Sequence, residues 1–82
     1  MLERRINVLS SLEARPASLF VQTASQFSSD IKVRIDEKMV NAKSIMGIIS
    51  LGILEGQVID VIANGTDEVA ALDSIEKFIK SL

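Results

Sequence analysis

The chain has 82 residues, a formal net charge of -2 and a pI near 5.0, with 48% hydrophobic but only 4% aromatic residues. This length allows one domain with a modest aliphatic core and leaves no room for a second lobe or a deep substrate cleft. The acidic balance and scarce aromatics argue against direct nucleic-acid binding, which depends on clustered cations or stacking platforms.

Two chemically important residue types are absent. The chain has no cysteine, which excludes disulfides and thiolate metal sites, and no histidine, the usual acid-base group near neutral pH. No apolar run is long enough to cross a bilayer, and the opening MLERRINVL lacks the apolar core of a secretory signal. The sequence therefore predicts a soluble cytoplasmic protein without metal, cofactor or membrane contact.

The first predicted elements are a strand and a helix. Residues 2–8 alternate as a half-buried strand with Ile6 and Val8 on the inner face. After a loop, a helix begins at Pro16, because proline suits the first helical position, and ends near Ser28. Its apolar stripe consists of Ala17, Phe20, Val21, Ala24 and Phe27.

A hairpin and a short helix follow. Residues 30–36, DIKVRID, predict a strand with one solvated face, and its inner face holds Ile31, Val33 and Ile35. A tight turn leads to a short strand over residues 39–41. Ser44 is the predicted N-cap of a helix that ends at Gly52.

The last predicted elements are a fourth strand within GQVIDVIANG and a helix capped by Thr66. Asp67 and Glu68 occupy the first turn of this helix, where they suit the macrodipole. Its buried stripe consists of Leu72, Ile75, Ile79 and Leu82, and its outer face carries the i,i+4 pairs Asp73–Lys77 and Glu76–Lys80. The order βαββαβα predicts an α+β fold in which helices cover one face of an antiparallel sheet.

The segment SLEARPASLF, residues 11–20, carries a candidate anion site at a helix mouth. Free N–H groups and the positive end of the helix dipole lie beside Arg15, which the following proline biases toward an extended conformation. Such a mouth can hold a phosphate or a carboxylate. Alternatively, Glu13 caps the helix and pairs with Arg15.

Ser44 and the helix after it carry a second candidate site. Ser44 is either an N-cap alone or also a phosphorylation site, because a phosphate there meets the positive end of the helix. Ile48 and Leu51 can fill the core, which leaves an apolar patch of Ile45, Met46 and Ile49. That patch is either a partner surface or covered by a neighbouring loop. Val58 and Ile62 on the outer sheet face either support a dimer or are isolated aliphatics.

Four motifs together resemble the HPr family of the bacterial sugar phosphotransferase system. They are ARPA at 14–17, FVQTAS at 20–25, VNAKSIMGIISLGILEG at 40–56 and ANGTDEVAAL at 63–72. The resemblance covers essentially the whole chain and implies a single HPr-like domain over residues 1–82. Its fold is an open-faced β-sandwich of four antiparallel strands with three helices on one face.

The resemblance also implies what the two candidate sites do. In phosphocarrier members a histidine directly before ARPA accepts a phosphoryl group from enzyme I and passes it to sugar permeases. Glu13 stands at that position, so the chain resembles the catabolite repression branch, which lacks the active histidine. Glu13 then fills the anion site with a charge like that of a phosphorylated histidine. The implied protein is a regulator and not an enzyme.

The regulatory serine of the Gram-positive type corresponds to Ser44. In the family, HPr kinase/phosphorylase phosphorylates this serine, and the product docks on catabolite control protein A as a corepressor. The family's partner-binding face corresponds to Arg15, Lys43, Ser44, Ile45, Met46 and Ile49.

Two other functions remain open. One is a phosphocarrier whose histidine has been replaced by Glu13, by divergence or as an engineered mimic, and which keeps its enzyme I surface. The other is an interaction module that uses the apolar patch unmodified. For assembly, we expect a monomer or a weak homodimer, including one that exchanges the first strand.

Overall fold

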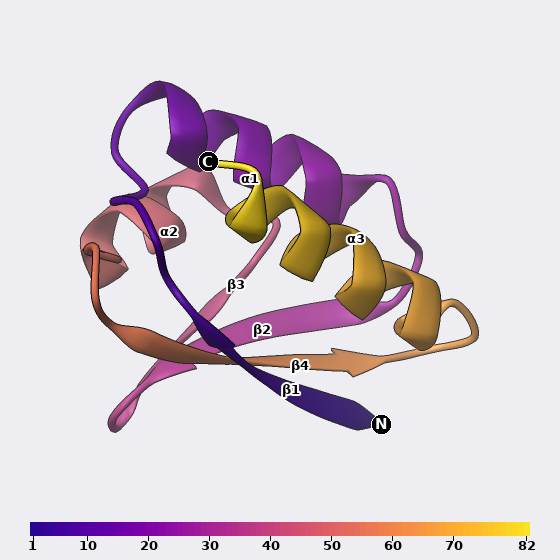
Figure 1. Cartoon of the computed structure of the whole chain (residues 1–82). Coiled ribbons are helices and arrows are strands. Elements are labelled where there is room, and N and C mark those ends of the chain that lie inside the picture. The colour runs from indigo at the N-terminus through magenta and orange to yellow at the C-terminus, as the bar shows by residue number, and fades with distance from the viewer.

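The computed structural model describes residues 1–82 as a four-stranded sheet with three helices on one face (Figure 1). The strands are β1 (Leu2–Asn7), β2 (Asp30–Ile35), β3 (Lys38–Asn41) and β4 (Val58–Asn64). The helices are α1 (Arg15–Ser25), α2 (Ile45–Leu51) and α3 (Glu68–Lys80). The predicted element order and the open-faced α+β architecture are confirmed.

The sheet has the order β1-β4-β2-β3, and all neighbouring strands are antiparallel. The last strand of the sequence is therefore central, while β1 and β3 form the two edges. In this register Ile6 of β1 lies opposite Ile59 of β4, and Val33 of β2 lies opposite Val61. The inward residues of neighbouring strands thus meet under the helices.

The core is aliphatic, as the composition predicts. Each helix contributes fully buried side chains, including Phe20 of α1, Ile48 of α2 and Ile75 of α3. Phe20 and Phe78 meet edge to face with their ring centroids 6.2 Å apart, and this contact joins α1 to α3. Burial of each large aliphatic side chain contributes roughly 1.5–3 kcal/mol.

The predicted ends of α1 were wrong at both termini. The helix begins at Arg15, with Pro16 second, so Arg15 is helical and not extended. Ala14 makes the non-helical turn instead, with φ 47° and ψ -109°. The helix ends at Ser25, before Ser28, because the N–H of Ser28 turns toward the Asp67 carboxylate at 2.9 Å.

The predicted start and stripe of α3 also need correction. Asp67, and not Thr66, occupies the N-cap position, and the Asp67 side chain does not cap its own helix because it binds the loop after α1. Leu72, Ile75 and Ile79 are buried as predicted, but Leu82 follows the end of the helix and is exposed.

Only one of the two predicted pairs on α3 forms. Lys80 Nζ lies 3.1 Å from Glu76 Oε2, whereas no pair joins Asp73 to Lys77. Asp73 instead accepts a hydrogen bond from Arg4 Nη1 at 2.6 Å, and the same nitrogen donates to Glu76 at 3.2 Å. Arg4 therefore ties the edge strand β1 to α3, a long-range contact that helical spacing cannot reveal.

Candidate functional site

The mouth of α1 has open amide groups. Ala14 is the N-cap residue and supplies no side-chain cap, and its carbonyl accepts the N–H of Ser18 at 3.1 Å. Pro16 has no N–H, so the amides of Arg15 and Ala17 are the donors left at the opening, and neither has a partner. Two free amides at the positive end of a helix can hold an anion.

Glu13 precedes the N-cap residue of α1 and has no partner. Its carboxylate makes no hydrogen bond and no ion pair, and Glu13 and Arg15 are both exposed. The alternative in which Glu13 caps α1 and pairs with Arg15 is therefore wrong. Ala14 has the positive φ that favours glycine, a backbone strain that costs on the order of 1–3 kcal/mol and is often found at functional sites.

Ser44 caps α2 as predicted. Its Oγ accepts the N–H of Gly47 at 3.1 Å, and its carbonyl accepts the N–H of Ile48 at 3.0 Å. Gly47 fits closely here, since a Cβ at this position would lie 3.2 Å from Cβ of Val40 and 3.3 Å from the Ser44 Oγ. Ser44 is half-buried, and its Oγ is directed at the opening turn of α2.

The side chains of α2 divide between core and solvent as predicted. Ile48 is fully buried and Leu51 is nearly so. Ile45, Met46 and Ile49 are 38%, 73% and 51% exposed, so no neighbouring loop covers them. We call these three residues the α2 patch.

Lys43 lies just before Ser44 but its ammonium turns away from the α2 patch. Lys43 Nζ donates to the carbonyl of Phe27 at 2.7 Å, in the loop after α1. Its backbone N–H donates to Asn41 Oδ1 at 2.9 Å. The sequence predicted Lys43 as a partner-binding residue, and in the free protein its charge stabilises the end of α1.

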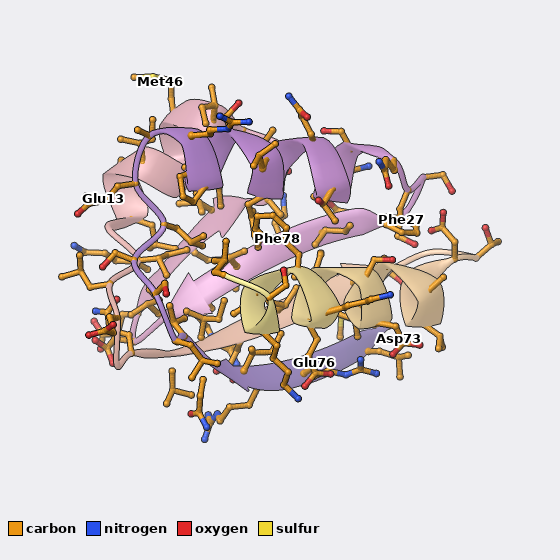
Figure 2. The ribbon with its side chains drawn as sticks, turned by 45° about the horizontal axis from the view of Figure 1, so that its top comes forward. Glu13, Phe27, Met46, Asp73, Glu76 and Phe78 are labelled. Atoms are coloured by element: carbon orange, nitrogen blue, oxygen red, sulfur yellow. The ribbon has the colours of Figure 1, made fainter.

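The two candidate sites occupy the same end of the molecule. α2 packs against α1 and β3, close to where α1 begins (Figure 1). Glu13 and Met46 both project from this end (Figure 2). The fold therefore brings Glu13, before α1, and Met46, on α2, to one end of the molecule, although the two segments are far apart in the sequence (Figure 2).

The structure contains two charged clusters that the sequence did not predict. On the outer sheet face Asp60 binds both Arg5, at 2.9 Å, and Arg34, at 3.1 Å. The hydrogen bond from Arg5 is the main cause that lowers the pKa of Asp60. At the end opposite the α2 patch, Asp67 binds the loop of Ser28 and Ser29. Each cluster joins strands or loops distant in sequence, so local spacing gives no signal for it.

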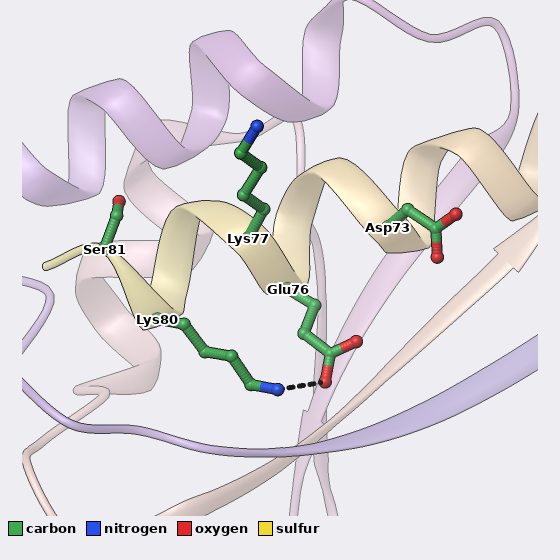
Figure 3. A pocket seen from close by; sticks show the side chains of 5 residues that line it. All are labelled: Asp73, Glu76, Lys77, Lys80 and Ser81. Carbon is green, nitrogen blue, oxygen red and sulfur yellow. Dashed lines mark ion pairs between the residues drawn. The ribbon is translucent and has the colours of Figure 1, made fainter.

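A shallow hollow along α3 is a weak candidate for a ligand site. Its lining is entirely polar and consists of Asp73, Glu76, Lys77, Lys80 and Ser81 (Figure 3). Glu76 and Lys80 pair with each other, and Lys77 points toward α1 (Figure 3). No group of carboxylates is arranged to hold a metal ion, and no helix is long and apolar enough to span a bilayer.

Comparisons with known proteins found relatives along nearly the whole length of the chain. The model described as "PTS HPr component phosphorylation site" matches residues 3–81. The HPr-like protein Crh of Halalkalibacterium halodurans is 46% identical over 82 residues, 98% of each chain.

Two solved structures have the same fold. The HPr-C-His structure from Thermoanaerobacter tengcongensis superposes with a TM-score of 0.92 at 52% identity, covering 99% of this chain and 93% of that one. The Bacillus subtilis Crh structure, described as an intertwined dimer with a swapping domain, has a TM-score of 0.81 at 42% identity, covering 99% and 95%.

Proposed function

The chain belongs to the HPr family, and on that premise we propose that it is a regulatory phosphoprotein of carbon catabolite repression. In this role HPr kinase/phosphorylase phosphorylates Ser44, and the phosphorylated protein acts as corepressor for catabolite control protein A. The observation that carries the proposal is the position of Ser44, whose side chain caps the start of α2 directly before the exposed α2 patch.

The chemistry of the modification suits this position. The kinase transfers the γ-phosphoryl group of ATP to Ser44 Oγ, releases ADP and takes up the hydroxyl proton. The new phosphate carries about -1.5 to -2 charges and lies at the positive end of α2, where the N–H of Gly47 already points at the Ser44 oxygen. Phosphorylation is therefore compatible with the folded helix.

The phosphate and the α2 patch together form a recognition surface with two chemistries. A dianion requires a cationic partner group, preferably arginine, while Met46 and Ile49 require an apolar pocket. Arg15, exposed at the same end, is free to bind an acidic group of the partner. Recognition then depends on Ser44 phosphorylation because the patch alone supplies only the apolar part.

Glu13 takes no part in phosphoryl transfer in this proposal. A carboxylate has no imidazole nitrogen on which to form a phosphoramidate, and the chain has no histidine elsewhere. The exposed side chain of Glu13, one residue before the N-cap residue Ala14, instead provides a permanent negative charge near the start of α1.

Incubation with HPr kinase/phosphorylase and ATP tests the proposal. Intact mass spectrometry should detect one added phosphate, which Ser44→Ala abolishes and Ser50→Ala retains, since Ser50 is an exposed serine on the same helix. The phosphorylated chain should then bind catabolite control protein A more tightly than the unmodified chain. Absence of phosphate transfer would refute the regulatory role.

A phosphocarrier that has lost its histidine is the second candidate. Its support is the similarity to an HPr structure, which is higher than the similarity to the Crh structure in both identity and TM-score. For this candidate, Glu13→His with enzyme I and phosphoenolpyruvate should yield a phosphorylated chain. Lack of labelling would mean that the enzyme I surface is absent as well.

The third possibility is an interaction module that binds its partners without phosphorylation, and the Ser44→Ala variant distinguishes it from the regulatory proposal. Its partners should remain bound to that variant. Under the regulatory proposal, in contrast, catabolite control protein A should bind kinase-treated Ser44→Ala no more tightly than the untreated variant.

A further inference from the structure

One asparagine of the chain is followed by glycine. Asn64 is the last residue of β4, and Gly65 begins the loop before α3. Asparagine is a chemically labile residue, because its side chain can react with the backbone nitrogen of the next residue. A side chain on that next residue hinders the approach, and glycine has none. The other asparagines, Asn7 and Asn41, precede valine and alanine, so Asn64 is the least hindered of the three.

Both groups needed for this reaction are free in the structure. The N–H of Gly65 donates no hydrogen bond, although the Gly65 carbonyl accepts the N–H of Glu68 at 3.3 Å. The Asn64 carboxamide also has no partner, and Asn64 is exposed on the outer face of the sheet, where it lines a hollow. The Asn41 carboxamide, in contrast, accepts the N–H of Lys43 at 2.9 Å. The nucleophile and the carbonyl carbon that it attacks are thus adjacent, unpaired and open to water.

We propose that Asn64 is a site of spontaneous deamidation and isomerisation. The Gly65 nitrogen attacks Cγ of Asn64 and loses its proton, and the side-chain nitrogen leaves with that proton as ammonia. The product is a cyclic succinimide between residues 64 and 65. Water, the only co-reactant, then opens the ring at either carbonyl. One opening yields aspartate, and the other yields isoaspartate.

The aspartate product places a new carboxylate directly opposite an existing one. Asn64 of β4 pairs with Asp30 of β2 across the sheet. The Asp30 side chain is exposed and has one cation nearby, Lys32 Nζ at 3.6 Å. Like charges directly opposite each other oppose strand pairing. Deamidation therefore weakens the pairing of β2 with β4 at this end, and the effect diminishes at high salt.

The isoaspartate product disturbs the neighbouring loop contact. Its backbone runs through the side-chain methylene, so the chain between β4 and Gly65 becomes longer. Gly65 has no room to move toward Ser29, because a Cβ on Gly65 would already lie 2.7 Å from Cα of Ser29. Asp67, in the same loop, accepts the amides of Ser28 and Ser29. Displacement of Gly65 therefore weakens the hold of Asp67 on the loop after α1.

The reactive pair lies away from the candidate recognition surface. Figure 1 shows the loop between β4 and α3 at the end of the molecule opposite α2. The α2 patch and Ser44 take no part in the reaction. This inference is therefore independent of the proposed regulatory role, and the modified chain should still accept phosphate on Ser44.

Incubation of the folded full chain at mildly alkaline pH, followed by peptide mass spectrometry over time, tests the modification. Trypsin releases residues 44–77 as one peptide in which Asn64 is the only asparagine. Replacement of NH2 by OH raises the mass of this peptide, and isoaspartyl methyltransferase labels the isoaspartate. Asn64 should deamidate several-fold faster than Asn7 or Asn41. Asn64→Gln keeps a carboxamide but lengthens the side chain, and it should abolish both the mass gain and the label.

Hydrogen exchange tests the effect on the loop, after ion-exchange chromatography has separated the modified chains. The isoaspartyl form should exchange the amides of Ser28 and Ser29 several-fold faster than the unmodified chain. Asn64→Asp is the matched control, because it adds the charge without lengthening the backbone, and it should accelerate these amides less. Equal exchange in the isoaspartyl form and Asn64→Asp would contradict the proposed loop effect.

Three outcomes of the incubation would overturn the modification itself. Asn64 in the folded chain could react no faster than Asn7 and Asn41, which would mean that the glycine gives no advantage. Aspartate could form without isoaspartate, which would mean that no succinimide is made. Deamidation could occur only in urea, which would mean that the fold keeps the Gly65 nitrogen from the Asn64 carboxamide.

Discussion

The carboxylate of Asp67 binds two consecutive residues of the loop between α1 and β2. Its oxygens accept the N–H of Ser28 at 2.9 Å and the N–H of Ser29 at 3.0 Å, and both serine hydroxyls also donate to it. These bonds, led by that of the Ser29 hydroxyl, lower the pKa of Asp67 to about 2. Gly65 permits the approach, because a Cβ there would lie 2.7 Å from Cα of Ser29.

Asp67→Asn should destabilise the protein in a pH-dependent way. A carboxyl whose pKa is lowered by folding stabilises the native state above its unfolded pKa, which is near 3.9, and that stabilisation disappears as the pH falls toward 2. Urea unfolding should therefore show the largest difference from the unmodified chain above about pH 4. Glu37→Gln, an exposed turn residue without a partner, is the control, and a difference independent of pH would contradict the assignment.

At the scale of the element, α2 depends on its cap because seven residues make a marginal helix. Ser44→Ala removes the oxygen that accepts the Gly47 N–H and should lower the free energy of unfolding by about 1 kcal/mol. Ser44→Asp keeps an acceptor and adds a charge that suits the helix dipole, so its stability should stay close to that of the unmodified chain.

Ser50→Ala is the matched control for the cap. Its hydroxyl donates to the Gly47 carbonyl at 3.0 Å from an exposed position, and its loss should change stability by less than about 0.5 kcal/mol. Chemical denaturation of the three variants measures these differences. If Ser44→Ala and Ser50→Ala lower the free energy of unfolding equally, the Ser44 cap is not what stabilises α2.

The attachment of β1 to α3 is the second contact between elements that can be tested. Arg4→Met removes both ion pairs to α3 and should reduce stability by up to about 1 kcal/mol, less at high salt. Hydrogen exchange of the β1 amides should accelerate, because an edge strand has few other restraints. Lys80→Met loses only the exposed pair to Glu76, so it should leave the β1 amides unchanged.

Local pattern predicted the elements, while contacts between elements set their ends. Strand alternation and the spacing around Ser44 and Gly52 suffice to predict the sheet, the cap of α2 and its division into core and patch. The start of α1 depends on the strained Ala14, and its end depends on Asp67, which lies far along the chain. Neither the backbone conformation of Ala14 nor the contact of Asp67 with this loop can be predicted from local sequence spacing.

The same limit applies to the candidate site. The two helix mouths were predictable, because Pro16 and Ser44 mark the starts of α1 and α2 in the sequence. The absence of a partner for Glu13 and the hydrogen bond from Lys43 to Phe27 were not, since each depends on how the loops pack. Long-range contacts decide whether a charged side chain is free to bind a partner or serves the fold.

At the scale of the whole molecule, stabilising contacts and the candidate recognition surface lie apart. The Asp67 contacts join the loops at one end, and the Arg4 contacts lie at the β1 edge. The α2 patch lies at the end where α1 begins (Figures 1 and 2). Its side chains are exposed and do not belong to the core. Substitutions in the patch should therefore alter binding without altering folding.

Two methionines of similar chemistry test this separation. Met46 in the α2 patch is 73% exposed, and Met39 on β3 is 51% exposed. Replacing either by alanine should change the free energy of unfolding by less than about 0.5 kcal/mol, since neither is buried. Met46→Ala alone should weaken binding of the Ser44-phosphorylated chain to catabolite control protein A by about 1–2 kcal/mol, because it removes an apolar anchor beside the phosphate. Calorimetric titration measures the difference, and equal losses from both variants would mean that the partner does not use the α2 patch.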